Sequence, residues 1–113
     1  MTTYGRADQY RIMWIFVTFD LPTETRLQRK EYVRFRTFLL QDGFAMQQFS
    51  LYIRHTNSYE HAEVHKRRVR KHLPRTGRVM MYNLTDKQFG MMENFSGPHR
   101  TPLPSPPGQL TIF

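Results

Sequence analysis

Cysteine, long apolar runs and acidic side chains are absent or scarce in this sequence, and each shortage excludes a class of protein. Without cysteine, the 113-residue chain forms no disulfide and no thiolate metal site, which is compatible with a reducing cytoplasm. The longest apolar run, residues 12–19, is too short to cross a bilayer and lacks a small-residue cleavage site, so we expect no membrane span and no export signal. The length predicts a single domain.

Positive charge is present in excess. Lys and Arg total 17 against 9 acidic residues, which gives a formal net charge of +8. Residues 54–78 hold eight of the basic residues and only two acids, Glu60 and Glu63. Such a concentration attracts polyanions. We expect nucleic acid rather than anionic lipid, because no exposed aromatic-rich amphipathic helix accompanies the charge.

The spacing of apolar residues predicts alternating strands and helices. The expected strands cover residues 12–19, 44–55 (split by a bulge or tight break at 47–50), 78–84 and 91–95, and the expected helices cover 24–41, 57–72 and one turn at 85–89. This βαββαβ order, with a short extra C-terminal strand, predicts a ferredoxin-like α+β sandwich. The fold by itself does not indicate a function.

Polar and glycine residues mark where the two long helices begin and end. Thr23 is the expected N-cap of the first helix, and Asp42-Gly43 is expected to end it, with Gly43 suited to a left-handed C-cap. Residues 57–60 resemble a capping box for the second helix. The residues expected to point inward are Leu27, Phe35, Phe38 and Leu39 on the first helix, and Tyr59, Ala62, Val69 and Leu73 on the second.

Both ends of the chain differ from the predicted domain, residues 12–95. Residues 1–11 are polar and aperiodic, so we expect a loose N-terminal extension. Residues 96–113 hold five of the seven prolines and predict an extended, flexible tail. The tail ends in an alternating apolar tip that suits binding to a partner, formed by Leu110, Ile112 and Phe113.

Asp20 ends the apolar run "FVTFD" and is the first candidate for chemistry. A buried charge is costly unless it is paired, and no basic residue is adjacent in sequence. The residues alone leave two interpretations open: a solvated residue ahead of the helix, or a metal ligand. One carboxylate is too few for Mg²⁺, but two-fold symmetry would bring two together.

The basic residues fall into two groups. Each alone is consistent with a solvated charged face, but together they favour binding to the nucleic-acid backbone, which requires no sequence recognition. The first group is Arg26, Arg29, Lys30 and Arg36, and the second is Lys66, Arg67, Arg70, Lys71, Arg75 and Arg78.

The remaining polar and aromatic candidates favour structural roles. His61 and His65 have the i, i+4 spacing of a metal pair, but no third ligand has suitable spacing. Ser50 has no base beside it and suits a bulge or a dimer contact. Phe44, Phe49 and Tyr52 would stack on bases in an RNA-recognition fold, but such residues more often fill a sheet face.

Several separated motifs, spanning Met13 to Phe113, resemble the CRISPR-associated Cas-two family. They are "MWIFVTFDLPT" followed by a basic helix, then "DGFAMQQFSLYIRH", then "GRVMMYNLTDKQFG". The "LTDKQFG" segment and the tail ending "QL-x-x-F" are similar to the subgroup of type II systems. The extension before Ile12 departs from the family pattern. Within the second motif the matching positions are Gly43, Gln48, Ser50, Leu51 and Tyr52.

This resemblance implies a homodimeric bacterial, cytoplasmic protein that bridges two dimers of the Cas-one integrase and holds a double-stranded DNA protospacer during spacer acquisition. A Cas-nine effector is a further candidate partner. Some members are described as Mg²⁺-dependent nucleases. The matched aspartate, Asp20, would then be catalytic and bind one Mg²⁺ per dimer together with its symmetry mate. A free-standing VapD-like endoribonuclease and an RNA-binding module remain the alternatives.

Overall fold

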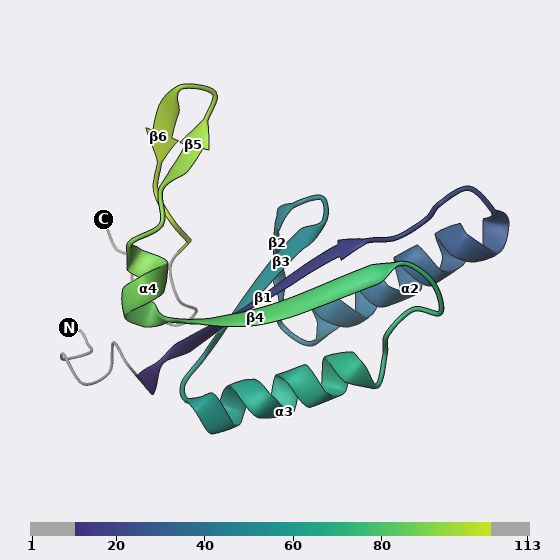
Figure 1. Ribbon diagram of the computed structural model, residues 1–113, viewed down its shortest axis with the longest axis horizontal. Helices are drawn as coiled ribbons and strands as arrows, with labels where there is room; N and C mark the ends of the chain where they lie inside the picture. The colour runs from purple at the N-terminus through teal and green to yellow at the C-terminus, as the bar shows by residue number, and fades with distance from the viewer. Residues whose placement is uncertain (1–10, 105–113) are drawn as a thin grey trace.

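One antiparallel sheet and two long helices organise residues 11–104, the part of the chain that the computed structural model describes (Figure 1). The strands and helices follow one another in the order expected from the sequence. They are β1 (Met13–Asp20), α2 (Arg26–Gln41), β2 (Ala45–Gln48), β3 (Leu51–Thr56), α3 (Tyr59–Arg70), β4 (Arg78–Thr85), α4 (Asp86–Gly90), β5 (Asn94–Ser96) and β6 (His99–Thr101).

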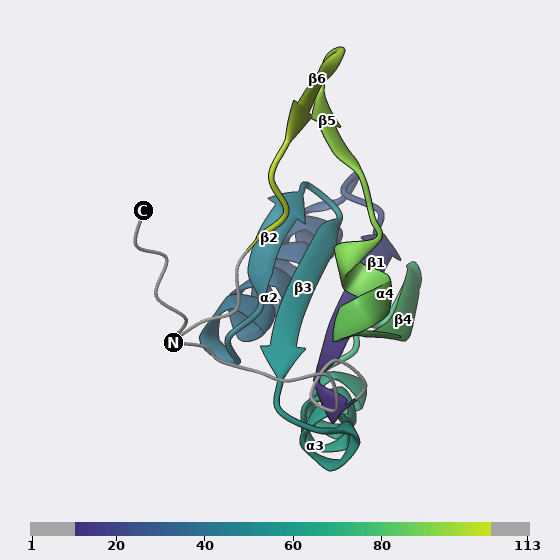
Figure 2. The same cartoon turned by 90° about the vertical axis from the view of Figure 1, so that its left-hand side faces the viewer.

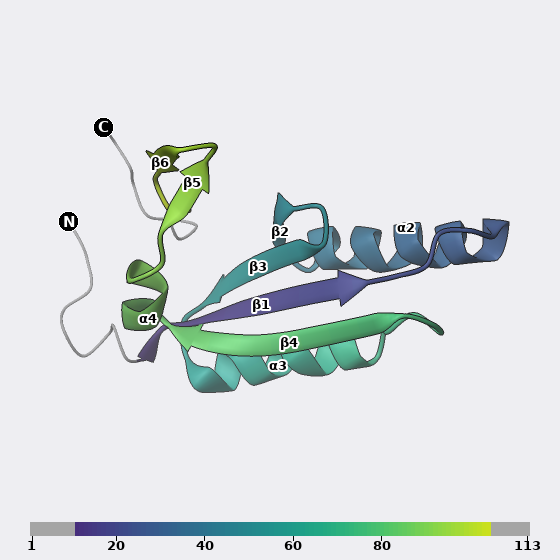
Figure 3. The same cartoon turned by 45° about the horizontal axis from the view of Figure 1, so that its top comes forward.

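The main sheet has the strand order β2-β3-β1-β4, and every neighbouring pair is antiparallel. Figure 3 shows β3, β1 and β4 running side by side, with β1 between the other two. The central position of β1 agrees with its continuous apolar sequence, because such a strand is covered on both faces. This arrangement confirms the predicted ferredoxin-like α+β fold.

Alternate residues of β1 enter two separate apolar clusters. Ile15, Val17 and Phe19 pack with Phe35 of α2 and Val69 of α3, so both long helices cover the same face of the sheet. The opposite face is covered only at one end. There, the side chains of Trp14 and Phe16 pack against a second cluster with Ile53 of β3 and Phe89 of α4.

The first turn of α2 begins later than the sequence suggested. Thr25 is the N-cap, and a capping box joins its side chain and backbone to Gln28, so the expectation of Thr23 was wrong. Ser58 caps α3 by accepting the backbone N–H of His61. Of the residues expected to point inward, three are exposed instead: Leu27 in the first turn of α2, Tyr59 at the first position of α3, and Leu73 in the loop after α3.

The second predicted strand is divided as expected. Strands β2 and β3 form a hairpin whose turn contains Phe49 and Ser50, and the register shifts between Met46 and Gln48. Ser50 therefore has a structural position, because its backbone oxygen accepts the N–H of Phe19 at 3.1 Å.

The segment after β4 folds into one helical turn and a separate hairpin. The predicted turn at 85–89 corresponds to α4, whose N-cap is Thr85. The predicted last strand corresponds to β5, but it pairs with β6 and not with the main sheet. The expected domain boundary at residue 95 falls inside β5. Figure 2 shows this hairpin projecting away from the main sheet. Residues 1–10 and 105–113, which include the predicted apolar tip, lie outside the described residues.

Candidate nucleic-acid interface

Asp20 is the last residue of β1 and its side chain is exposed, so no buried charge needs a partner. The side chain belongs to the same sheet face as Trp14, Phe16 and Thr18, which is opposite to the helices because side chains alternate along a strand. Its partner across the antiparallel pair with β4 is Arg78. The carboxylate is therefore displayed at one end of the sheet, beside a cation.

One chain alone supplies a single metal ligand at this position. Among residues 11–104 no group of three His, Cys, Asp or Glu side chains is arranged to hold a metal ion. Mg²⁺ is commonly held by one or two carboxylates and several waters. The donor set of one protomer is thus incomplete, and a second carboxylate would have to come from a second protomer.

The first basic group covers the outward face of α2. Arg26, Arg29 and Lys30 lie in its first two turns and line a shallow hollow of about 520 Å³ together with Val33 and Arg34. The Arg29 side chain donates hydrogen bonds to the carbonyls of Thr23 and Glu24, which holds it in place.

The second basic group lies on α3 and the loop after it. Glu63 forms ion pairs with Lys66 at 3.3 Å and with Arg70 at 3.9 Å, so these two side chains are partly engaged within the helix. In the part of the chain that the structure covers, no hydrogen bond or ion pair engages the side chains of Arg26, Lys30, Arg36, Arg67, Lys71 or Arg78.

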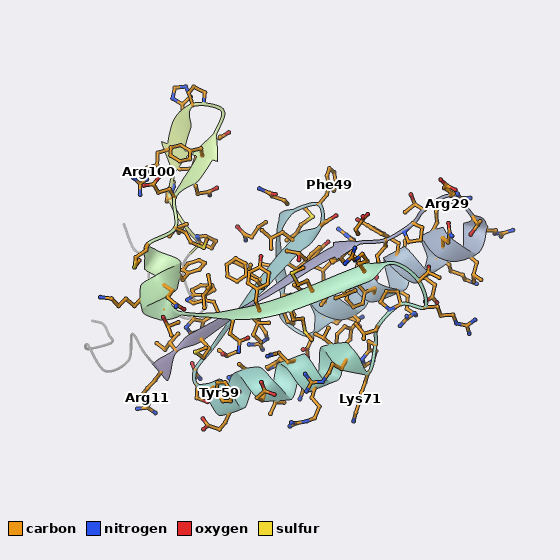
Figure 4. All side chains as sticks on the ribbon, in the orientation of Figure 1. Arg11, Arg29, Phe49, Tyr59, Lys71 and Arg100 are labelled. Atoms are coloured by element: carbon orange, nitrogen blue, oxygen red, sulfur yellow. The ribbon has the colours of Figure 1, made fainter. Side chains whose placement is uncertain are left out.

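The two basic groups, far apart in sequence, meet at one end of the molecule. Arg34 of α2 donates to the carbonyls of His72 and Leu73, which follow α3, and Glu31 accepts the backbone N–H of Arg75. These bonds join the middle of α2 to the loop after α3. Figure 4 shows Arg29 and Lys71 towards the same end of the molecule, whereas Arg11 and Arg100 lie at the other end.

Sequence reasoning missed a group of charged residues that the fold brings together around Asp42. Its carboxylate accepts from His65 Nδ1 at 2.7 Å and from Arg68 at 2.9 Å, while its backbone oxygen accepts from Arg54 Nε at 2.8 Å. All three partners are at least 12 residues away, so no local pattern would have revealed them. Arg54 and Arg68 are therefore engaged by contacts within the fold, although the side chain of Arg68 is 53% exposed.

His61 and His65 interact with each other instead of forming a three-ligand metal site. Their Nε2 atoms are 3.2 Å apart, and His61 Nδ1 accepts the backbone N–H of Asn57 at 3.3 Å. Because Nδ1 of His61 is an acceptor, Nε2 carries the proton that is donated to His65. His65 in turn donates to Asp42. Both rings thus have hydrogen-bond partners within the protein, which is consistent with a structural role.

Only one of the three aromatic candidates for base stacking is accessible. Phe44 and Tyr52 are buried in the cluster beneath the helices, which leaves no ring face free. Phe49, at the β2–β3 turn, is 80% exposed.

A search of the helices in residues 11–104 finds none with the length and apolar character of a membrane span.

Together, the fold and site define a ferredoxin-like α+β protein with one strand-terminal carboxylate and a cation-rich end. The family model described as CRISPR associated protein Cas2 matches residues 13–92. The chain belongs to this Cas2 family, which confirms the resemblance inferred from the motifs.

Full-length relatives give the same result. The chain is 53% identical over 110 residues to a protein of Flavobacterium psychrophilum, covering 97% of this chain and 96% of that protein. It is 46% identical over 101 residues to a protein of Parvibaculum lavamentivorans, covering 89% and 100%, respectively. A protein of Streptococcus mutans is 35% identical over 103 residues, covering 89% and 93%. Each relative is named "CRISPR-associated endoribonuclease Cas2".

Proposed function

We propose that this Cas2 protein is a DNA-binding scaffold of CRISPR spacer acquisition. In this role a homodimer bridges two dimers of the Cas-one integrase and holds the backbone of a protospacer duplex. The observation that carries the proposal is the convergence of two basic groups at one end of the molecule (Figure 4). Exposed cations gathered from separate elements suit phosphate binding without sequence recognition.

The site of a single protomer supports binding more than chemistry. It offers several unengaged basic side chains, but among residues 11–104 it has no group of three carboxylate or histidine side chains that could hold a metal ion, and Asp20 has no general base paired with it. A scaffold needs affinity for the duplex backbone and a surface for its partners, and it does not need a complete active site in each chain. The apolar tip, Leu110, Ile112 and Phe113, is proposed to bind the integrase or the dimer partner. A Cas-nine effector remains a candidate partner of the assembled complex.

The test is the salt dependence of duplex binding in a matched pair of double variants. Arg26→Ala/Lys71→Ala removes one exposed cation from each basic group. Arg11→Ala/Arg100→Ala removes the same charge from the opposite end of the molecule (Figure 4). Each lost phosphate contact lowers the slope of log K against log salt by about one. The first variant should therefore lose about two units of slope, and the second should lose none.

Two further measurements address assembly. Co-purification with the integrase tests the bridging role, and light scattering tests the homodimer. Equal loss of slope in both double variants would show that binding follows net charge alone and would contradict a defined interface. A monomeric protein that fails to capture the integrase would contradict the scaffold role itself.

The second candidate function is a metal-dependent nuclease, and the endoribonuclease part of this proposal is favoured by the names of the relatives. In this proposal two Asp20 carboxylates, one from each protomer, would hold one Mg²⁺, which would supply an activated water for phosphodiester hydrolysis. Asp20→Asn should then abolish Mg²⁺-dependent cleavage of RNA or DNA and leave duplex affinity close to that of the wild type. Cleavage that survives in Asp20→Asn would refute the nuclease candidate but leave the scaffold proposal intact.

A further inference from the structure

Asp20 and Arg78 form an exposed pair of opposite charges at the edge of the interface. They are direct partners in the β1–β4 ladder, so their side chains project to the same face of the sheet. Within residues 11–104 both side chains are exposed, and neither forms an ion pair or hydrogen bond with another described residue. The two residues lie in a shallow hollow of about 350 Å³, lined by Thr18, Phe19, Asp20, Arg78, Val79 and Met80.

Gly77 fixes the approach of β4 to this point. Its φ of +93° is a conformation that L side chains rarely adopt. A Cβ atom at this position would lie 2.8 Å from the backbone oxygen of Asp20, 3.0 Å from Leu21 Cα and 2.6 Å from Leu21 Cδ2. Two of these three atoms belong to the backbone, which cannot move aside as a flexible side chain can. Any side chain at residue 77 would therefore separate the start of β4 from the end of β1.

The chemistry of this pair suits one phosphate group of a nucleic acid. A carboxylate alone repels a phosphodiester, whereas a guanidinium binds phosphate oxygens through two parallel hydrogen bonds. With Arg78 held beside Asp20, the local charge is balanced, so a phosphate can approach the carboxylate. Without that cation, Asp20 would oppose the attraction exerted by the rest of the basic surface.

We propose that Arg78 contacts a backbone phosphate beside Asp20, and that Gly77 is the residue that positions Arg78 for this contact. The inference rests on the proposed binding of nucleic acid, but it does not depend on cleavage or on a metal ion. Arg78 differs in this respect from the cations of α2 and α3. Its contact with a phosphate requires the close approach between Gly77 and the Asp20–Leu21 peptide.

The experiment is a double-mutant cycle between Gly77 and Arg78 on duplex DNA, with the salt slope as the measurement. Arg78→Ala and Gly77→Ala should each lower the slope by about one. Gly77→Ala/Arg78→Ala should lose no more than either single variant, because both changes remove the same contact. The salt slope of Gly77→Ala/Arg26→Ala should fall by about two units, because Arg26 contacts a different phosphate from Arg78.

Gly43 provides the matched control for backbone strain. It has the same φ of +93°, but a Cβ there meets only the side-chain guanidinium of Arg54. Gly43→Ala should therefore keep the wild-type salt slope even if its melting temperature falls. If Gly77→Ala does not fold, Gly77→Asn replaces it, since asparagine tolerates positive φ better while still carrying a Cβ atom.

Each outcome separates this inference from the proposed function. A wild-type protein without affinity for duplex DNA overturns both. A wild type with a steep slope, combined with an unchanged slope in Arg78→Ala, overturns this inference alone. If the salt slope of Gly77→Ala/Arg78→Ala falls by about two units, Gly77 does not act by positioning Arg78. A changed oligomeric state in Arg78→Ala would assign Arg78 to a contact between protomers instead.

Discussion

Asp42 joins three parts of the chain although it lies just after a helix. Its carboxylate side chain is only 9% exposed and binds His65 and Arg68 of α3, while its carbonyl binds Arg54 of β3. From the sequence, Asp42 was expected only to end α2. Its partners were unpredictable because the packing of α2 and α3 over the same face of the sheet, and not sequence spacing, makes them neighbours.

Replacing Asp42 by alanine should lower the free energy of unfolding by about 1–3 kcal/mol, because the buried donor His65 loses its acceptor. Urea denaturation measures this effect. Glu93→Ala is the control, since its ion pair with Arg100 is long, at 3.9 Å, and exposed. The control should stay within about 0.5 kcal/mol of the wild type. Similar losses in the two variants would mean that the Asp42 contacts contribute nothing beyond surface charge.

Two histidines make stability depend on pH. Burial lowers the pKa of His55 below its ordinary 6.5, with the nearby Arg54 and His61 adding to the effect and Asp86 opposing it. Burial also lowers the pKa of His61, assisted by His65, Arg54 and Arg68 and opposed by Asp42. Consistent with this, His55 Nε2 is buried and has no hydrogen-bond partner among the described residues. The folded state thus favours the neutral form of both rings.

Stability should therefore fall as the pH drops below about 6.5, because the unfolded chain then binds protons that the folded chain binds less readily. Above that pH, the two histidines no longer make the free energy of unfolding depend on pH. Urea midpoints between pH 5 and 8 measure the decline. His55→Asn and His61→Gln should flatten it, whereas His99→Gln, on the exposed hairpin, should not. An identical decline in all variants would assign it to other groups.

Among the elements, α2 shows how local signals succeed and fail. Its existence and its end near Gln41 were predicted correctly from apolar spacing and Gly43. Its start was wrong by two residues, because Thr23 and Thr25 are both competent caps. Gln28, three residues after Thr25, was the signal that distinguished them, since it completes a capping box. Exposure of Leu27 follows from its place in the first turn, which no spacing rule reveals.

Because Thr25 and not Thr23 caps α2, alanine variants of the two threonines should differ in stability. Thr25→Ala should lower the free energy of unfolding by about 0.5–2 kcal/mol, because the first turn of α2 loses an acceptor for the N–H of Gln28. Thr23→Ala should have a much smaller effect, since only its backbone carbonyl is used, by Arg29. Thermal melts of the two variants measure the difference. A larger loss for Thr23→Ala would reverse the assignment of the cap.

For the whole molecule, the chain after β4 closes one end of the open sheet face. Phe89 of α4 stacks on Trp14 with ring centroids 3.9 Å apart, and Asp86 accepts the indole N–H at 2.8 Å.

The basic residues were recognisable in the sequence, but their convergence at one end of the molecule was not. It depends on how α2 and α3 pack over the sheet, and that geometry is a property of the complete fold.

Because Trp14 is the only tryptophan, its fluorescence reports on this closure. Phe89→Ala should shift the emission to longer wavelength and lower the free energy of unfolding by about 3–5 kcal/mol. Phe95→Ala, on the exposed hairpin, is the control and should change neither property appreciably. An unchanged emission maximum in Phe89→Ala would mean that α4 does not shield the indole in solution.

The central position of β1 also governs the order of events during synthesis. This strand leaves the ribosome before its two neighbours, β3 and β4, which begin at Leu51 and Arg78. At roughly 5–20 residues per second, about 3–15 seconds separate the synthesis of β1 from that of β4. Until β3 is made, the apolar sequence "WIFVTF" has no ladder on either side, and until β4 is made it has a ladder on one side only. The nascent chain is therefore most prone to aggregation before β4 is made, and a chaperone that binds this stretch would act within that interval.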